Sequence, residues 1–250
     1  MAPDVSIVIP VKNERDNIGA LVLAIAETCD PICGFEVLVV DDGSTDDTAA
    51  HVADMCRADP RIRLLQHPQS AGQSAAVHSG VIAAQAPIVC TLDGDGQNPA
   101  SELPKLFAPL MTDEAGTLGL VAGQRVARQD TFSKRWASKF ANGLRARMLN
   151  DGTRDTGCGL KGFRREAFLA LPYFNHMHRY LPALFKRDGW EIALVDVAHA
   201  ERGAGTSKYT NFGRAMVGVY DLIGVAWLIR RRKTAKASEP ATTAQGAPRG

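Results

Sequence analysis

The chain has 250 residues, of which 45% are hydrophobic and 22% charged, with a formal net charge of +2. This length allows one large domain or two small ones with a substantial buried core, and the apolar fraction is ordinary for a globular protein. A charge so near neutrality gives no reason to expect a nucleic-acid partner.

The five cysteines form no CxxC pair, and no spacing of Cys and His completes a zinc site. We therefore expect reduced thiols in a cytoplasmic protein. The first residues, MAPDVSIVIPV, have neither a basic region nor a cleavage site, so we do not expect a signal peptide. They lead directly into a predicted strand.

The first half of the chain alternates predicted strands and helices. Val5–Val11 is a β-branched run closed by Pro10, which is typical of a parallel strand covered on both faces. Apolar residues at helical spacing then predict a helix with Asp16 as its N-cap, ended by Pro31 and Gly34. Further strands are predicted at Phe35–Val40, Ile62–Gln66 and Ile88–Leu92, and further helices from a cap at Ser44 or Thr45 to Arg57 and over Ala71–Gln85.

This strand-loop-helix order predicts an α/β fold with an open, mostly parallel sheet flanked by helices. Such sheets bind ligands beyond the carboxyl ends of their strands. Three polar loops leave carboxyl ends and are expected to converge there: Lys12–Arg15, Asp41–Ser44 and Asp93–Gln97. The chain has no GxGxxG or Walker A glycine loop, which argues against a dinucleotide oxidoreductase or a P-loop hydrolase.

The most informative stretch is Asp93-Gly94-Asp95-Gly96, followed by Gln97, directly after a buried strand. Side chains two residues apart in extended chain point the same way, so both carboxylates can face one cation. Hard oxygen ligands suit Mg²⁺ or Mn²⁺ that bridges a substrate's phosphates. We therefore predict a metal site at Asp93, Asp95 and Gln97, with a plain surface turn as the alternative.

The second half of the chain is richer in basic residues. A helix is predicted around Pro104 and Pro109, and a strand over Leu118–Ala122 that leads to Gly123-Gln124-Arg125. A helix predicted over Phe132–Met148 has one basic side, for which a solvated surface is the alternative; its basic residues are Lys134, Arg135, Lys139, Arg145 and Arg147. A glycine-rich loop with Asp155 and Lys161 follows at Gly152–Gly162, then a strand at Ile192–Val197.

The apolar stretch Phe212–Ile229 is short and interrupted by Asp221, whereas a spanning helix needs about 20 predominantly apolar residues. We expect an interfacial or packed helix. Its apolar stripe and the basic run after it suit anionic lipid headgroups, with a helix packed on the core as the alternative. The stripe comprises Met216, Val219, Tyr220, Ile223 and Trp227, and the basic run is Arg230 to Lys233.

Three segments, VSIVIPVKNERDNI, VLVVDDGSTDDT and VCTLDGDGQNP, together resemble the family 2 inverting glycosyltransferases of the GT-A fold. In the second half, GQR, RDTGCGLKGFRRE and HAERGAGTSKY resemble the polyprenyl-phosphate (dolichol-phosphate) sugar transferases. The resemblance covers roughly residues 4–212. We predict a transferase domain over 1–212, an amphipathic membrane-proximal helix over 213–233 and a disordered tail over 234–250.

The resemblance implies a nucleotide-sugar donor of GDP-mannose or UDP-glucose type and a polyprenyl phosphate acceptor. The implied base and ribose contacts are Pro10, Asn13, Glu14 and Asp42. The metal and diphosphate would lie at Asp93, Gly94, Asp95 and Gln97, with Arg202 and Lys208 on the phosphates. The acceptor phosphate would meet Arg125, Arg135 and Ser138, and the catalytic residues would be Asp93, Asp95 and Arg202. Such an enzyme would work at the inner face of the membrane.

The charge pattern favours a phosphate acceptor. A phosphate monoester has a second pKa of about 6, so it needs positive charge rather than a general base. Between Gly123 and Asp151 the sequence offers many Arg and Lys, one acid at Asp130 and no His. Asp155 could serve as a base and keeps a hydroxyl acceptor open. A nucleotidylyltransferase and a non-catalytic nucleotide-sugar binding module are the remaining alternatives.

Overall fold

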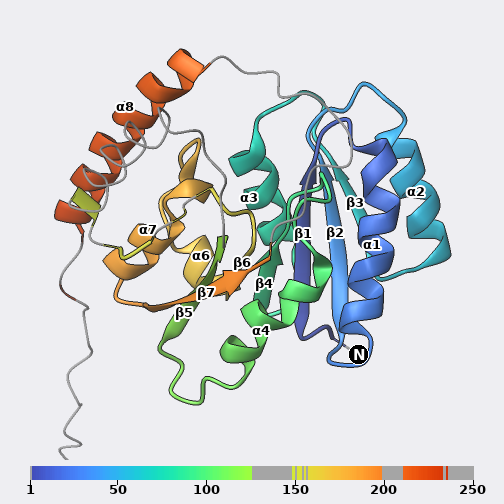
Figure 1. Cartoon of the computed structure of the whole chain (residues 1–250), viewed down its shortest axis with the longest axis horizontal. Helices are drawn as coiled ribbons and strands as arrows, with labels where there is room; N and C mark the ends of the chain where they lie inside the picture. Colours follow the sequence, from blue (N-terminus) through green and yellow to red (C-terminus); the bar gives the residue numbers. More distant parts are fainter. Residues whose placement is uncertain are drawn as a thin grey trace, which may run out of the picture.

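The computed structural model describes residues 2–125, 148–149, 151–153, 155, 157–198, 211–232 and 235, with side chains in the last helix from 218 onward. Seven strands form one sheet in the order β3-β2-β1-β4-β6-β5-β7 (Figure 1). The strands are β1 (Val5–Val11), β2 (Phe35–Asp41), β3 (Ile62–Gln66), β4 (Ile88–Thr91), β5 (Leu118–Arg125), β6 (Lys161–Arg164) and β7 (Glu191–Val197).

Helices cover both faces of this sheet. The longer ones are α1 (Arg15–Cys29), α2 (Thr48–Ala58), α3 (Gln73–Ala83), α4 (Leu103–Met111), α7 (Leu181–Arg187) and α8 (Asn211–Arg230). Shorter turns are η1 (Ala100–Glu102), α6 (Arg165–Leu169) and η2 (Met177–Arg179). In Figure 1, α8 lies beside α7 at the end of the molecule away from α1 and α2.

The direction of the strands fixes where a ligand site can form. β1 pairs in parallel with β2 and β4, and β2 pairs in parallel with β3. β6 is antiparallel to both β4 and β5, so β4 and β5 run in the same direction, and β7 is parallel to β5. The carboxyl ends of every strand except β6 therefore meet at one edge of the sheet, together with the amino end of β6.

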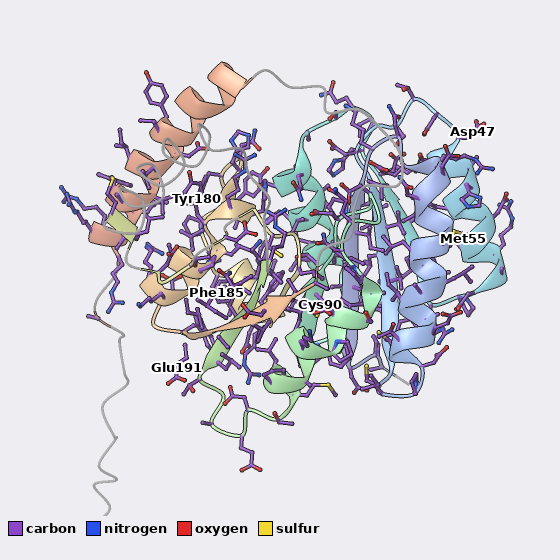
Figure 2. All side chains as sticks on the ribbon, viewed as in Figure 1. Asp47, Met55, Cys90, Tyr180, Phe185 and Glu191 are labelled. Carbon is purple, nitrogen blue, oxygen red and sulfur yellow. The ribbon has the colours of Figure 1, made fainter. Side chains whose placement is uncertain are left out.

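Alternation along the strands divides the core into two apolar layers. In β1, Ile7 and Ile9 face the layer that includes α1, α2 and α4, while Val8 faces the layer of α3, α6, α7 and α8. Phe163 on β6 stacks on Phe168 of α6 with ring centroids 4.8 Å apart, and Phe185 of α7 lies 6.0 Å away. Figure 2 shows Phe185 among the side chains between α7 and the sheet.

The predicted α/β sheet is confirmed, with strand boundaries within one or two residues for β1, β2, β3, β4 and β7. β1 has the predicted bounds Val5–Val11, although Pro10 lies inside the strand, one residue before its end, rather than closing it. β5 is longer than predicted, since it runs on through Arg125. Neither the position nor the antiparallel direction of β6 was predicted, and Lys161 opens that strand rather than lying in a loop.

Two predicted helix caps are wrong. α1 begins at Arg15 with Glu14 in the cap position, so Asp16 lies in its first turn. α2 begins only at Thr48. Ser44 and Thr45 bond instead to the loop after β1: Asn13 N–H donates to Ser44 Oγ at 2.9 Å, and Thr45 N–H donates to Asn13 Oδ1 at 2.8 Å.

α8 covers most of the segment predicted as a separate amphipathic helix. No helix in the described ranges is both long and apolar enough to cross a membrane. The helix predicted over Phe132–Met148 falls outside the described residues except at its end, as do the segment HAERGAGTSKY and nearly all of 234–250. The proposed division of the chain into 1–212, 213–233 and 234–250 stays a prediction.

Candidate active site

A pocket of about 400 Å³ opens at the carboxyl edge of the sheet, between the loops that follow β1, β2 and β4. This volume is within the usual range for small-molecule sites. Six of the predicted donor residues line it: Pro10, Glu14, Asp42, Asp93, Gly94 and Asp95. Lys12, Ser70, Gly72 and Gln73 complete its polar wall. The predicted convergence of the three loops is therefore confirmed.

The lining of this pocket is strongly acidic. Four carboxylates, from Glu14, Asp42, Asp93 and Asp95, face one ammonium group, from Lys12. Burial, together with the neighbouring Asp95, raises the pKa of Asp93 above its usual value, although Lys161, Asn98 and Arg125 oppose the shift. A divalent cation would relieve this concentration of negative charge, so the residues present fit a Mg²⁺ or Mn²⁺ ion.

The two aspartates of the metal motif have different surroundings. Gln73 Nε2 donates to Asp93 Oδ1 at 2.8 Å, and Asn98 Nδ2 donates to Asp93 Oδ2 at 3.2 Å. A side chain at Gly159 would overlap the Asp93 carboxylate, so any larger residue there would displace Asp93. Asp93 is thus seated against the β6 side of the sheet.

Asp95 follows two residues later, and its Oδ1 accepts a hydrogen bond from Gln97 N–H at 3.1 Å. Gln97 is partly buried but does not line the pocket. The described residues hold no cluster of three or more His, Cys, Asp or Glu side chains in metal-binding geometry. Mg²⁺ commonly binds to one or two carboxylates and completes its shell with water and substrate phosphates, so two aspartates are sufficient.

Asp42 organises the opposite wall of the pocket. Its Oδ1 accepts a hydrogen bond from Ala71 N–H and contacts His67 Nδ1, both at 2.8 Å. Its Oδ2 accepts from Ser70 Oγ at 2.7 Å and from Gly72 N–H at 2.9 Å. Burial alone would raise the pKa of Asp42, but these hydrogen bonds lower it to about 2. Asp42 therefore fixes the segment that leads into α3.

A cluster of buried polar groups behind Asp93 was not anticipated. Lys161 Nζ is buried and donates to the Cys158 carbonyl oxygen. His178 Nδ1 lies 2.7 Å from Ser74 Oγ, and burial, reinforced by nearby cationic groups, lowers the pKa of His178 to about 3. Both side chains line a small cavity with Asp93. In the sequence, nothing distinguishes Lys161 from other lysines near glycines. Its position beside Asp93 follows from the pairing of β6, which the sequence did not predict.

Arg125, the last residue of β5, is paired with Asp155. Arg125 Nε donates to Asp155 Oδ2 at 2.5 Å, and Nη2 donates to Oδ1 at 2.9 Å. Arg125 also lies close enough to Asp93 for the two charges to affect each other's pKa. The structure thus brings Arg125 near Asp93, although Arg125 does not itself line the pocket. Arg135, Ser138, Arg202 and Lys208 lie outside the described residues.

This architecture defines the class of protein. Glucosyl-3-phosphoglycerate synthase from Mycobacterium tuberculosis, in complex with Mn²⁺, UDP-glucose and glycerol 3-phosphate, superposes with a TM-score of 0.66. It has 21% sequence identity and covers 91% of this chain and 80% of that one. A mannosyltransferase from Pyrobaculum calidifontis in complex with GDP-mannose and Mn²⁺ superposes with a TM-score of 0.64 at 21% identity, covering 93% and 66% of the two chains. The fold is that of the GT-A glycosyltransferases.

Sequence comparison makes the assignment more specific. Residues 6–171 match the profile of the family described as "Glycosyl transferase family 2", and the chain belongs to that glycosyltransferase family. It is 33% identical over 225 residues to undecaprenyl-phosphate 4-deoxy-4-formamido-L-arabinose transferase from Pectobacterium carotovorum. It is 33% identical over 221 residues to the protein of that name from Klebsiella pneumoniae. Each match covers 88% of this chain and 66% of the relative, so the chain spans just under two thirds of their length.

Proposed function

We propose that this chain transfers a sugar from a nucleotide-diphosphate sugar to a polyprenyl phosphate, with inversion at the anomeric carbon. The observation that carries the proposal is the pairing of two unlike regions at one sheet edge. An acidic pocket ending at Asp93 and Asp95 suits a metal-bound diphosphate. The Arg125 guanidinium, on the far side of Asp93, suits a second anion. The similarity to undecaprenyl-phosphate transferases supports the choice of acceptor.

The donor would be held along the pocket. Glu14 and the segment fixed by Asp42 would flank the nucleoside, and Pro10 would lie under it. Asn13 does not line the pocket but joins the loops after β1 and β2, so we assign it a supporting role. Asp95, with Asp93 behind it and Gln97 beside it, would hold Mg²⁺ or Mn²⁺. When bound, that ion stabilises the charge that develops on the leaving diphosphate. GDP-mannose and UDP-glucose are the leading donors, since related folds bind these compounds.

A phosphate acceptor would need a positive charge beside Asp93, such as that of Arg125, rather than a general base. A dianionic phosphate attacks without giving up a proton, and its approach to the diphosphate must be compensated by positive charge. Arg125 supplies a fixed charge there. In this scheme Arg202 and Lys208 would add charge on the donor phosphates and Arg135 on the acceptor phosphate, to which Ser138 would donate a hydrogen bond.

We further propose that α8 holds the enzyme on an anionic membrane surface. One face of α8 packs on the body, where Leu222 and Val225 are buried. The opposite face carries Val219, Tyr220, Ile223 and Trp227, with 52% to 70% of each side chain exposed. Their spacing of i, i+1, i+4 and i+8 places them on one arc of the helix.

The charges around this exposed arc fit a lipid surface. Arg230 and Arg231 are exposed and continue the arc at its C-terminal end. The acid of the helix, Asp221, lies on the packed side, where its Oδ2 is 3.0 Å from His176 Nδ1. An apolar face with Trp and Tyr, bordered by arginine, is the pattern of helices that lie in the headgroup layer of anionic membranes.

A transfer assay tests the catalytic proposal. The protein, Mg²⁺ or Mn²⁺ and a polyprenyl phosphate in detergent are incubated with a panel of radiolabelled GDP- and UDP-sugars, and organic-phase label is counted. We expect label from one donor, dependent on polyprenyl phosphate and abolished by EDTA. Donor hydrolysis without lipid label would favour the alternative function, which is transfer to a hydroxyl of a glycan or small molecule. Donor binding without turnover would favour a non-catalytic nucleotide-sugar binding module.

Vesicle flotation tests the membrane proposal. We expect the protein to float with vesicles that contain about one third phosphatidylglycerol, and much less with pure phosphatidylcholine. Trp227→Ser combined with Ile223→Ser should reduce flotation about tenfold, because two apolar side chains are lost from the exposed arc. The matched control is Leu23→Ser, which removes a side chain with 65% exposure from α1. Equal flotation of both variants and the wild type would contradict the proposal.

A further inference from the structure

Arg125 and Asp155 form a two-pronged ion pair. Both donors on one edge of the guanidinium bind the two carboxylate oxygens, at 2.5 and 2.9 Å. The side chains are 20% and 14% exposed. An arginine fork accepts a carboxylate or a phosphate in the same two-pronged arrangement. Asp155 therefore presents to Arg125 the contact that a phosphate monoester would present.

The pair lies at the same edge of the sheet as Asp93. Ala122 on β5 pairs with Lys161 on β6, and Lys161 pairs with Thr91 on β4, two residues before Asp93. Arg125 follows Ala122 by three residues along β5 and so projects from the same edge as Asp93. The charge of Lys161 opposes the rise in the pKa of Asp93, and the charge of Asp93 raises the pKa of Arg125. These three groups therefore lie close together. The Asp155 carboxylate is thus at the metal side of the pocket, not at a remote surface.

Asp155 is held at this position by its own backbone. Asp155 N–H donates to Gln124 Oε1 at 3.0 Å, and Gly157 N–H donates to Asp155 Oδ1 at 3.0 Å. Gln124 is itself buried on β5, next to Arg125. These contacts keep the carboxylate opposite the guanidinium without any ligand. They do not require the charge of Asp155, since an amide oxygen can accept the same bond from Gly157.

We propose that Asp155 is a placeholder for the acceptor phosphate: it occupies the guanidinium fork of Arg125 until the acceptor displaces it. This inference rests on the proposed function and assigns a role to a residue that would otherwise be read as a general base. A base needs a lone pair directed at the substrate hydroxyl, whereas both oxygens of Asp155 are directed at Arg125. Asp155 is therefore a positioning residue that acts through Arg125.

The decisive variant is Asp155→Asn, assayed at varied polyprenyl phosphate with saturating donor. Removing the competing charge should lower the acceptor KM about fivefold and leave kcat within about threefold. Asp155→Ser also removes the charge and keeps a hydroxyl that can accept the Gly157 N–H, so it should also lower the acceptor KM. A kcat loss of a hundredfold or more in both variants would identify a base and overturn the proposal. An unchanged or raised KM would overturn it as well.

A second ion pair, formed by Arg164 at the end of β6, provides the matched control. Arg164 Nη2 donates to Asp113 Oδ2 at 2.9 Å, with side chains 21% and 12% exposed, at the end of the sheet away from the pocket. Asp113 also accepts a hydrogen bond from Leu118 N–H, at the start of β5. Asp113→Asn should disturb the fold to a similar extent but leave the acceptor KM within about twofold of wild type. A KM change equal to that of Asp155→Asn would point to a general effect on the sheet.

A double-mutant cycle separates this inference from the proposed function. Arg125→Gln should raise the acceptor KM by tenfold or more, and Asp155→Asn should have no further effect on KM in that background. A fivefold decrease that persists without Arg125 would overturn the placeholder role. Absence of any lipid label with the wild-type protein would instead refute the proposed function, before any variant is compared.

Discussion

The two halves of the sheet hold their polar groups in different ways. On the half formed by β3, β2, β1 and β4, Asp42 is surrounded by neutral hydrogen-bond donors from one nearby segment. On the half formed by β6, β5 and β7, Arg125 is held by an opposite charge, and the ammonium of Lys161 is buried. The hydrogen bonds of Asp42 all come from the protein, whereas the ion pair of Arg125 is one in which an anionic ligand can replace the carboxylate.

This difference indicates how the two substrates would be received. Hydrogen bonds within one wall fix the proposed donor pocket as soon as the chain folds, so binding of the donor would require little rearrangement. Charge pairs on the acceptor side can instead be redistributed when an anion of suitable shape arrives. Asp93 belongs to the first half but is packed against Gly159 of the second. Changes at this junction should therefore have the largest effects, and changes within one half smaller ones.

The largest effect is expected for Asp95→Ala, at the junction. We expect kcat to fall by about 10²- to 10³-fold or more, because the residue that would hold the cation against the leaving group is lost. The unfolding midpoint should be nearly unchanged, since Asp95 is partly exposed. Asp54→Ala, an exposed aspartate of α2, is the control. Full activity of Asp95→Ala at Mg²⁺ or Mn²⁺ concentrations that saturate the wild type would show that the junction is not the metal site.

A smaller effect is expected for Gly159→Ala. The added methyl group would overlap the Asp93 carboxylate and move it from its place between Gln73 and Asn98. A displacement of that size can reduce kcat by about 10- to 100-fold. Gly224→Ala, where a methyl group meets open space on α8, is the matched control and should keep full activity. Titrating activity with Mn²⁺ would test the cause, since a displaced Asp93 should raise the metal concentration required.

Asp42→Asn should act on stability within the donor half. The folded-state pKa of about 2 is lower than the ordinary value of 3.8, so the ionised carboxylate stabilises the fold at pH values above about 4. This contribution, of about 2 kcal/mol, is lost as the pH falls through 2. Urea unfolding should therefore show a loss of that size for Asp42→Asn at pH 7 and a smaller one near pH 2.5. The same difference at both pH values would contradict the assignment. Asp47→Asn, an exposed neighbour, is the control.

The sequence predicts the parts of the fold that depend on local pattern. The buried strands that lead to Asp42 and Asp93 are mostly apolar, and the polar loops after them had to meet because parallel strands share an edge. β6 has only four residues, KGFR, and owes its conformation to pairing with β4 and β5 on both sides. Nothing in its own composition distinguishes it from a loop.

The site residues that the sequence did not reveal depend on contacts between distant segments. The hydrogen bonds to Asp42 come from residues 25 to 30 positions away. Ser44 and Thr45 have the composition of helix caps, but the tertiary contact with Asn13 takes precedence over the local preference. Arg125 was predicted from the resemblance alone, and its fork with Asp155 could not be, because 30 residues separate the two.

α8 is fastened to the body by more than its buried leucine and valine. Tyr180 Oη donates to the Gly218 carbonyl at 3.3 Å, Arg187 Nε donates to the Leu228 carbonyl at 2.9 Å, and Asp221 meets His176. Because α8 is attached at several points, its orientation relative to the rest of the protein is fixed. Once its exposed arc lies on a bilayer, the tilt of the whole molecule is set, and the remaining freedom is spin about the membrane normal and lateral diffusion. Encounters with the proposed lipid acceptor would then be a two-dimensional search in which the mouth of the pocket keeps a constant height above the membrane.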